Sequence, residues 1–370
     1  MGGARSRRLV GASLVTALTA VLGVGAASAD PLDRCGIAAK DRTLCGRVVV
    51  PLDRSGALAG SVSLRVRALS PARGAAATGT VLALAGGPGQ AAVPLLEDFA
   101  SVLAPGLRTR RLVTFDQRGT GGSGRLRCTA LSARGSLAEV IGRCASELGP
   151  RRTTYTTATS VADIESVRAA LGVERLILYG ASYGTKVALL YAATYPQHVE
   201  RLVLDSVVPP EGIDPFQRAT LASIPRVLRT LCAADCGFTR SAAADVAQLA
   251  HRLARSPLRG TAIDGSGRPH RAAIGEPGLL ALLLTGDFDR FLRAATPAAV
   301  RAALDGDAAP LLRLAARSAP DALATSGDSD ALYAATTCED GGVPWAPGTP
   351  MAQRRAAVEA AARAIPDADF

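Results

Sequence analysis

The feature that most constrains the fold is a serine set between glycines where a strand-like segment meets a helical one. Gly180-Ala181-Ser182-Tyr183-Gly184 follows the apolar run Leu176–Tyr179 and precedes the helical stretch Thr185–Thr194. An apolar run of that length is typical of a buried strand, so the pentapeptide must turn the chain from strand to helix. Only glycine tolerates the crowding beside the serine in such a turn. The turn holds the hydroxyl clear of the sheet, which makes Ser182 a candidate nucleophile.

The same alternation of strand-like and helical segments extends from Gly46 to Ser206. Most of the candidate strands are continuous apolar runs, the pattern of strands that are buried on both faces of a parallel sheet. The clearest helix is Ser160–Leu171, with Ser160 as its expected N-cap. We predict an α/β fold with a doubly wound, mostly parallel sheet whose first two strands form an antiparallel start. The candidate strands are Arg47–Val50, Val62–Leu69, Thr80–Ala85, Arg111–Phe115, Arg175–Tyr179 and Arg201–Leu204.

The composition changes after Val208-Pro209-Pro210. Residues 211 to about 335 are rich in Ala, Leu and Arg, and their helical periodicity is broken by Pro and Gly without a convincing strand. We therefore predict an N-terminal core over residues 30–209 and a helical cap over residues 210–335, inserted after the sixth strand. Residues 336–370 are expected to return toward the core.

A second glycine-rich turn, Ala85-Gly86-Gly87-Pro88-Gly89, follows the third predicted strand. Such a turn lets backbone N–H groups approach a substrate carbonyl oxygen. The Gly87 N–H would pair with the N–H of Tyr183, the residue after the nucleophile, to form an oxyanion hole. The positive end of the helix after Ser182 would face the same oxygen. No G-K-[ST] follows this turn, which argues against a phosphate-binding loop.

Three segments together resemble the exported tripeptidyl aminopeptidase branch of the α/β hydrolases, which is akin to the proline iminopeptidases. They are Ala85–Gly89, Asp116-Gln117-Arg118-Gly119-Thr120-Gly121, and Gly180–Gly184 with Thr185. Val50–Asp53 and Leu202–Asp205 add support. Ala85 departs from the pattern, because the proline iminopeptidases usually carry histidine at that position.

The resemblance implies an α/β-hydrolase fold and a serine peptidase that releases tripeptides or single residues from peptides with free N-termini. It implies no cofactor. Glu339 and Asp340 lie where the chain returns from the cap, and they are candidates for binding the free amine of the substrate. Asp116 and Arg118 are expected to brace the loop beside the active site rather than to take part in the chemistry.

The serine has no evident base. In this fold an acid and then a histidine follow the nucleophile along the chain. His198 precedes the sixth strand and is therefore expected at the end of the sheet opposite Ser182, while His251 and His270 lie in the predicted cap. We expect the final strands, which carry the acid and the histidine, to lie beyond Phe370. The 370-residue chain is then expected to be inactive as it stands.

Residues 1–29 have the pattern of an export signal. Three arginines precede the apolar stretch Leu9–Val24, and Ala27-Ser28-Ala29 forms a small-residue cleavage site. The apolar stretch is short and contains glycines, which favours cleavage over retention as a membrane anchor. We expect a secreted protein that has no stable membrane association once the signal is removed.

Seven cysteines in an exported chain indicate disulfide bonds. A zinc site is the alternative, but the chain has no C-x-x-C and its three histidines are not at ligand spacing from a cysteine. Cys338 is left over, and its partner is expected beyond Phe370. Pairing of nearest neighbours gives Cys35–Cys45, Cys128–Cys144 and Cys232–Cys236.

The net charge does not indicate a polyanionic partner. The chain has 42 Lys and Arg against 32 Asp and Glu, a formal net charge of +10. Only two of the basic residues are lysines, and asparagine is absent, a bias typical of GC-rich coding. No basic run and no patch of basic residues interleaved with aromatics is present, so no nucleic acid is expected as a partner.

Two other functions remain open at this point. The first is an esterase or lipase that uses the same site, because the serine turn alone does not distinguish ester from amide cleavage. The second is a non-catalytic binding protein or a degenerate remnant. Comparing the hydrolysis of a free-amine peptide anilide with that of its N-acetylated form distinguishes an aminopeptidase from an esterase or lipase. Only an aminopeptidase should lose activity on acetylation.

We predict that the export signal is cleaved before Asp30, because Ala27-Ser28-Ala29 offers small residues at the positions that a signal peptidase reads. N-terminal sequencing of the exported protein measures this directly. A mature chain that starts upstream of residue 20 would contradict the prediction.

Overall fold

The computed structural model describes residues 2, 32–35, 42–71, 77–212, 214, 216–233, 236–264, 266–318, 326–346 and 349–365. The export signal and the cleavage site predicted over residues 1–29 lie outside this set, apart from Gly2. Within it, no helix combines the length and the apolar character that crossing a bilayer requires.

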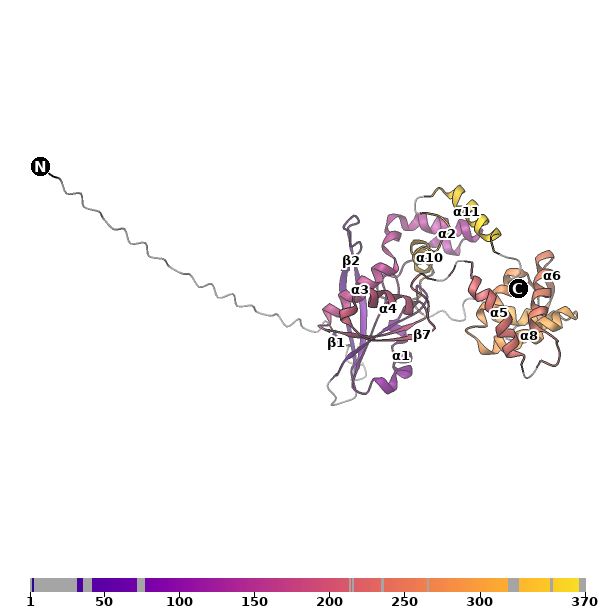
Figure 1. Ribbon diagram of the computed structural model, residues 1–370, viewed down its shortest axis with the longest axis horizontal. Helices are drawn as coiled ribbons and strands as arrows, with labels where there is room; N and C mark the ends of the chain where they lie inside the picture. Colours follow the sequence, from indigo (N-terminus) through magenta and orange to yellow (C-terminus); the bar gives the residue numbers. More distant parts are fainter. Residues whose placement is uncertain are drawn as a thin grey trace.

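A seven-stranded mixed sheet forms the centre of the N-terminal half, with the strand order β1-β2-β3-β5-β4-β6-β7 (Figure 1). Strands β1, β2 and β3 are antiparallel, and β3 joins β5 in antiparallel register; β5, β4, β6 and β7 are parallel. The predicted α/β class and the antiparallel start are confirmed. The strands are β1 Leu32–Arg34, β2 Thr43–Pro51, β3 Ser61–Leu69, β4 Thr80–Leu84, β5 Arg111–Phe115, β6 Leu176–Ala181 and β7 Val199–Asp205.

Helices cover both faces of this sheet, and strand β4 shows why. All its residues are buried, and alternate side chains face opposite layers. Leu82 and Leu84 pack with helices α3 (Thr157–Ala170) and α4 (Tyr183–Thr194), whereas Val81 and Ala83 pack with α1 (Leu96–Val102). The continuous apolar runs in the sequence are therefore strands in the middle of a three-layer arrangement.

Helix α3 starts earlier than predicted. Its N-cap is Thr156, whose hydroxyl accepts a hydrogen bond from the Thr159 N–H at 3.1 Å, and Ser160 is buried inside the helix. The prediction of Ser160 as N-cap is wrong because Thr156 satisfies a free N–H of the first turn one turn earlier along the chain.

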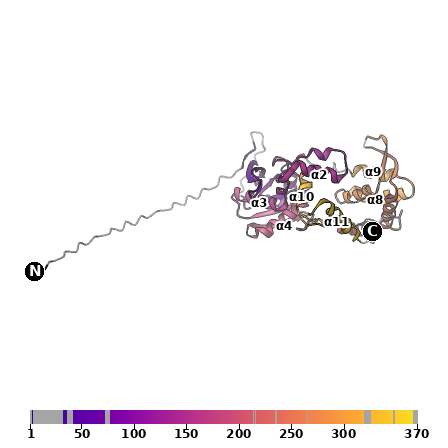
Figure 2. The same ribbon diagram turned by 90° about the horizontal axis from the view of Figure 1, so that it is seen from above.

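A helical unit follows the sheet along the chain and, in Figures 1 and 2, lies beside it. It has an apolar core of its own, with Val246, Leu249, Leu282, Val300 and Leu311 at the centre, and every member of that core lies between residues 221 and 315. Its helices are α5 Arg218–Leu231, α6 Ala242–Arg255, α7 Glu276–Thr285, α8 Arg290–Leu304 and α9 Ala309–Arg317.

The helical unit also contains a β-hairpin, which corrects the expectation that this region has no strand. Strands β8 (Leu258–Ile263) and β9 (Pro269–Ile274) pair in antiparallel register. The hairpin carries little apolar alternation because only Ala262 and Ile274 are buried in it. Its turn is held by Asp264, whose Oδ1 accepts from the N–H groups of Ser266 and Arg268 at 2.9 and 3.0 Å.

Helix α10 (Asp330–Glu339) packs on the sheet domain rather than on the helical unit, although it begins within the range expected for the cap. Its buried Ala331, Leu332 and Ala335 form one cluster with Leu126 and Tyr155. The remaining elements are α2 Leu137–Leu148, α11 Met351–Arg363 and the short 3₁₀ helices η1 Val93–Leu95, η2 Ala104–Gly106, η3 Thr129–Ser132, η4 Gly149–Thr154 and η5 Pro196–His198.

The three predicted disulfides are present, and Cys338 is a free, exposed thiol. The Cα–Cα distances are 5.1 Å for Cys35–Cys45, 5.3 Å for Cys128–Cys144 and 4.9 Å for Cys232–Cys236. These distances lie in the range in which a disulfide forms without movement of the backbone.

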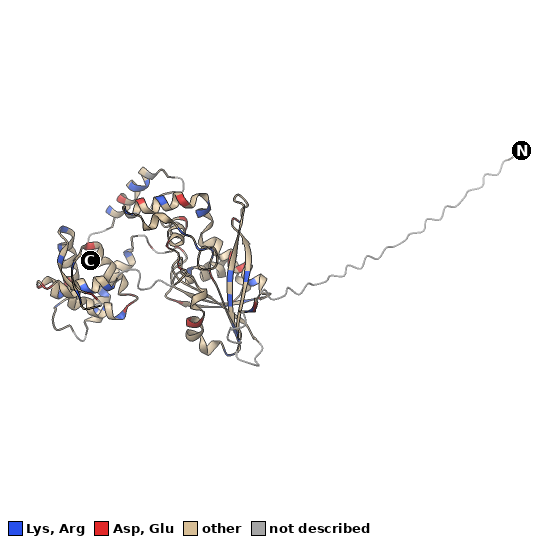
Figure 3. Cartoon of the chain, turned by 180° about the vertical axis from the view of Figure 1, so that it is seen from behind, with Lys and Arg blue, Asp and Glu red and all other residues tan. Residues whose placement is uncertain are grey.

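Basic and acidic residues are interspersed over the described helices (Figure 3). Some form ion pairs one helical turn apart, such as Arg301 with Asp305 and Arg363 with Glu359. Pairs of this spacing support helices modestly.

A half-buried polar cluster closes the end of the sheet where β7 begins. The Glu165 carboxylate accepts hydrogen bonds from Arg168 and Tyr191 at 2.6 and 2.8 Å, and it lies 3.1 Å from His198 Nδ1. The cluster therefore joins α3, α4 and η5. The bond from Arg168, and then those from Tyr191 and His198, lower the pKa of Glu165 from its ordinary value of 4.5 to about 2.

We predict that Glu165 contributes acid stability. The fold lowers the pKa of Glu165, so its contribution to the free energy of unfolding is complete above about pH 4.5. This contribution is lost as the pH falls toward about 2. Urea unfolding between pH 7 and pH 2 measures this. Glu165→Gln should lower the free energy of unfolding at pH 7 and make it less dependent on pH over the acid window. Glu174→Gln, which changes an exposed carboxylate just after α3, is the control, and equal pH profiles for all three proteins would contradict the prediction.

Candidate active site

Ser182 lies at the turn between β6 and α4, as the sequence predicts. Its backbone has φ 51° and ψ −121°, a conformation that residues with a side chain rarely adopt. The Ser182 N–H donates to the carbonyl of Asp205 at the end of β7, at 2.9 Å, and this bond fixes the turn against the neighbouring strand. The serine is thus held in a strained, well-anchored turn at the carboxyl end of a parallel strand.

The two glycines that flank this turn leave no room for a side chain. A Cβ atom added to Gly180 would lie 2.5 Å from the Gly184 carbonyl oxygen, and one added to Gly184 would lie 2.5 Å from the Leu84 carbonyl oxygen. Helix α4 therefore approaches strand β4 backbone to backbone. This contact explains both glycines of the G-x-S-x-G pattern.

The glycine-rich turn after β4 packs directly against the serine. A Cβ atom added to Gly86 would lie 3.1 Å from the Ser182 Cβ. The Gly86 N–H is held by Gln90 Oε1 at 3.1 Å, and Gly87 has φ 104°. Tyr183 is the first residue of α4, so its N–H has no partner within the helix. The structure brings together Ser182, the Gly87 turn and the start of α4; the oxyanion role of Gly87 and Tyr183 stays a prediction.

Asp116, directly after β5, joins the 3₁₀ helix η1 to the loop that follows β5. Its carboxylate is fully buried and accepts from the Val93 N–H at 2.9 Å and from the Gly122 N–H at 2.8 Å. A Cβ atom on Gly121 would lie 2.2 Å from the Asp116 carboxylate, and Gly121 has φ 40°. These are the contacts of a brace, as the sequence suggests.

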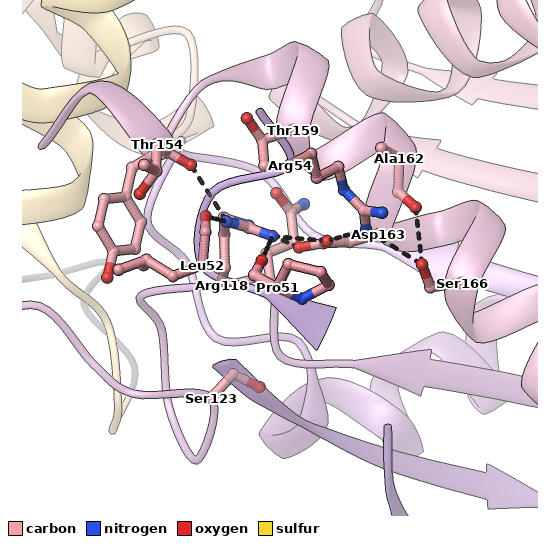
Figure 4. Close-up of polar contacts among 12 residues, drawn as sticks. Pro51, Leu52, Arg54, Arg118, Ser123, Thr154, Thr159, Ala162, Asp163 and Ser166 are labelled. Carbon is pink, nitrogen blue, oxygen red and sulfur yellow. Dashed lines mark hydrogen bonds and ion pairs between the residues drawn. The ribbon is translucent and has the colours of Figure 1, made fainter. Parts of the chain in front are cut away.

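Arg118 forms a second brace, shown in Figure 4. Its side chain is 1% exposed and binds the Asp163 carboxylate through Nε at 2.6 Å and Nη2 at 2.7 Å. It also donates to the carbonyls of Pro51, Leu52 and Thr154. Arg54 contacts Asp163 from the solvent side at 2.7 Å. The guanidinium is fully engaged inside the protein and is not available to a substrate.

The structure places Glu339 and Asp340 at the end of α10. Glu339 pairs with Arg152 at 3.2 Å and is partly exposed. The Asp340 carboxylate accepts from Lys186 Nζ and from the Thr157 N–H, both at 2.8 Å, and from the Thr157 hydroxyl. Their role toward a substrate amine stays a prediction.

The phenol of Tyr183 belongs to the same polar group. It lies 2.7 Å from the Thr157 hydroxyl. Because the single hydroxyl proton of Thr157 goes to Asp340, the phenol is the donor in this bond. Burial raises the pKa of Tyr183, and the nearby Asp340 charge adds to this effect. The phenol therefore stays neutral and anchors the residue that carries the candidate oxyanion donor.

No acid–base pair reaches the serine among the described residues. His198 lies in η5 at the start of β7 and pairs with Glu165, at the end of the sheet opposite Ser182 as predicted. His251 is in α6 and His270 in β9, and no described hydrogen bond joins any of the three histidines to Ser182. The same part of the chain holds no group of three or more residues able to bind a metal ion.

One set of contacts beside the site, made by the segment before α10, could not be predicted from the sequence. The segment before α10 bonds to both loops beside the serine: the Gly121 N–H donates to the Gly327 carbonyl and the Ser329 N–H donates to the Gly89 carbonyl, both at 2.9 Å. Asp328 accepts from the Ala91 N–H at 2.9 Å. These residues are more than two hundred positions apart in the chain, and backbone bonds over that separation leave no sequence pattern.

The sheet order and the turn at Ser182 define the fold class, and comparisons with known proteins agree with it. A family model described as the alpha/beta hydrolase fold matches residues 79–255. The serine protease Hip1 of Mycobacterium tuberculosis is 30% identical over 197 residues, which cover 47% of this chain and 37% of that protein. The tripeptidyl aminopeptidase of Streptomyces lividans is 29% identical over 201 residues, 48% of this chain and 37% of its own.

A third relative, the proline iminopeptidase of Neisseria gonorrhoeae, is 33% identical over 127 residues, 34% of this chain and 32% of its own. The match spans about a third of the length of each of these relatives. The chain therefore has the α/β-hydrolase fold. Within that fold it is similar to serine peptidases and aminopeptidases, as the sequence motifs predict.

We predict that Asp163 is essential for stability and Arg54 is not. Asp163→Ala leaves the buried Arg118 guanidinium without a counter-charge, which should cost about 3–5 kcal/mol of the free energy of unfolding. Arg54→Ala removes only the more exposed partner and should cost less than about 1 kcal/mol. Chemical denaturation of the three proteins measures both losses. Similar losses for the two variants would contradict the assignment of Arg118–Asp163 as the brace.

Proposed function

We propose that this chain belongs to an exported serine aminopeptidase that removes tripeptides or single residues from peptides with a free N-terminus. The observation that carries the proposal is the strained turn at Ser182, packed against the Gly86–Gly89 turn. The similarity to a tripeptidyl aminopeptidase and to proline iminopeptidase supports the substrate class. Three disulfides support export, because such bonds persist in oxidising compartments.

In the proposed reaction, the Ser182 hydroxyl attacks the carbonyl carbon of the scissile peptide bond and gives its proton to a base. The carbonyl oxygen becomes an oxyanion that the N–H groups of Gly87 and Tyr183 stabilise. The intermediate collapses to an acyl-enzyme on Ser182, and the amine leaves with a proton. Water then releases the N-terminal fragment. In this reaction, the positive end of the α4 dipole stabilises the negative charge that develops on the carbonyl oxygen.

The substrate amine is the part of the proposal that distinguishes an aminopeptidase from an esterase. A free N-terminus is a cation and needs an acidic partner. Of the two candidates, the Asp340 carboxylate already accepts from three donors, whereas Glu339 has a single surface partner, Arg152. Glu339 is therefore the better-placed of the two to exchange its partner for a substrate amine.

We also propose that the 370 residues alone do not turn over substrate. The described residues bring no histidine to Ser182, so the hydroxyl stays protonated and weakly nucleophilic at neutral pH. In a serine protease, loss of the base lowers turnover by about 10⁶. The acid and the base are expected from sequence outside this chain.

A fluorophosphonate probe tests the proposal, because it reacts covalently only with an activated serine. The 370-residue chain should label no more than its Ser182→Ala variant. The product of the complete reading frame should label at Ser182 and hydrolyse a free-amine tripeptide anilide but not its N-acetylated form. Equal hydrolysis of both anilides would indicate an esterase-like or endopeptidase site. Strong labelling of the 370-residue chain would overturn the proposed inactivity and make His251 and His270 the first candidates for the base.

A further inference from the structure

Lys186 is a buried cation directly beside the serine turn. It lies on α4 one helical turn after Ser182, and its side chain is 8% exposed. Its ammonium donates to Asp340 Oδ2 at 2.8 Å. A buried lysine is costly to desolvate unless an opposite charge and hydrogen bonds compensate it. The position of the Lys186 ammonium is therefore set by Asp340.

Asp340 in turn joins three helices at one carboxylate. It caps the end of α10, and its Oδ1 accepts from the N–H of Thr157, the first residue of α3, at 2.8 Å. A carboxylate at this place also faces the positive end of the α3 dipole. The Thr157 hydroxyl bridges from Asp340 to the Tyr183 phenol. Along the rest of its length α10 packs on α2 and η4 (Figures 1 and 2).

The outgoing connection from the sheet domain to the helical unit passes this point. On the outgoing connection, the Val208 N–H donates to the Thr185 hydroxyl at 2.8 Å. Further along it, a Cβ atom added to Gly212 would lie 3.4 Å from Lys186 Nζ, so the backbone passes directly over the ammonium. Helix α10, which packs on the sheet domain, ends at Asp340. Neighbouring residues of α4 thus hold the outgoing connection and the end of α10.

We propose that Lys186 and Asp340 are positioning residues for the proposed hydrolysis. Together with Thr157 they fix the Tyr183 end of α4, and they fix the outgoing connection and the end of α10 against it. The ion pair then sets the direction of the Tyr183 N–H in the oxyanion hole. The inference rests on the proposed function for its catalytic part and on the contacts alone for its structural part.

This role competes with the expectation that Asp340 binds the amine of a substrate. To reach Asp340, that amine would have to displace the Lys186 ammonium from a carboxylate that already accepts from three donors. Displacement would leave a buried lysine without its counter-charge, which is unfavourable. Hydrogen–deuterium exchange and enzyme kinetics together distinguish the positioning role of Asp340 from a role in binding the substrate amine.

Hydrogen–deuterium exchange of the 370-residue chain tests the structural part without any need for activity. Asp340→Asn and Lys186→Met should each speed exchange by about tenfold in peptides that cover Tyr183, the outgoing connection and the end of α10, since the loss of one partner from a buried pair promotes local opening. Exchange in β2, β3 and α8 should not change. The double variant should resemble either single variant, because both remove the same interaction.

Arg152→Gln is the matched control, because it breaks the exposed neighbouring pair with Glu339 on the same helix end; exchange near Tyr183 should then stay as in the parent chain. Lys186→Arg, which keeps the charge, should restore most of the protection. Unchanged exchange in Asp340→Asn, a uniform increase over the whole chain, or additive effects in the double variant would each overturn the proposal.

The product of the complete reading frame tests the catalytic part. Asp340→Asn should lower kcat for a free-amine tripeptide anilide by about tenfold or more with little change in KM, because an interaction made in the transition state is weakened. A rise in KM with kcat and exchange unchanged would instead assign Asp340 to the substrate amine and overturn the proposal. If the exchange pattern appears but neither form labels or hydrolyses, the proposed function fails while the structural role of the pair stands.

Discussion

The close approach of helix α4 to strand β4 is the constraint on which the rest of the structure depends. At Gly184 the helix backbone contacts the Leu84 carbonyl, and no residue with a side chain fits there. This contact forces the turn at Ser182 into its positive φ and aims the start of α4 at the space above β4. The Gly86–Gly89 turn must then pack on the serine, because it leaves the same strand end. A single steric requirement thus places the candidate nucleophile and both candidate oxyanion donors.

Buried charges hold several of the segments around this turn. Asp116 joins η1 to the loop after β5, Arg118–Asp163 fixes that loop to β2 and α3, and Lys186–Asp340 fixes α10 to α4. Each pair has enough hydrogen bonds to offset the cost of burying its charges. Hydrogen-bonded ion pairs are directional, whereas apolar packing is not. An oxyanion hole needs this directionality because its donors must point at one oxygen. Stability and preorganisation therefore rest on the same residues.

The sequence predicts the parts of the fold that local chemistry determines. The fully buried run of β4, the glycines around Ser182 and the three short disulfide loops each carry their own signal. The sequence predicts the N-cap of α3 wrongly because Thr156 and Ser160 are both good caps and only packing buries the second. The sequence does not predict the β8–β9 hairpin because few of its side chains are buried. The partners of Asp340 could not be foreseen, since an ion pair across 154 residues has no local pattern.

The nucleophile turn and the catalytic base depend on different parts of an α/β hydrolase, so the presence of one says nothing about the other. The turn is produced by β4, β6 and α4, all of which are present with their close contacts. A base must come from the carboxyl end of another strand, because the carboxyl ends of parallel strands meet at one edge of the sheet. Within the described residues, β7 ends at Asp205, whose carboxylate accepts from the Tyr179 hydroxyl at 3.1 Å, and β7 has β6 as its one neighbour. No described strand pairs with its other edge, and Val203 on this strand is 39% exposed. A parallel strand paired to that edge would place its own carboxyl end at the edge of the sheet that holds Ser182, where a base has to stand.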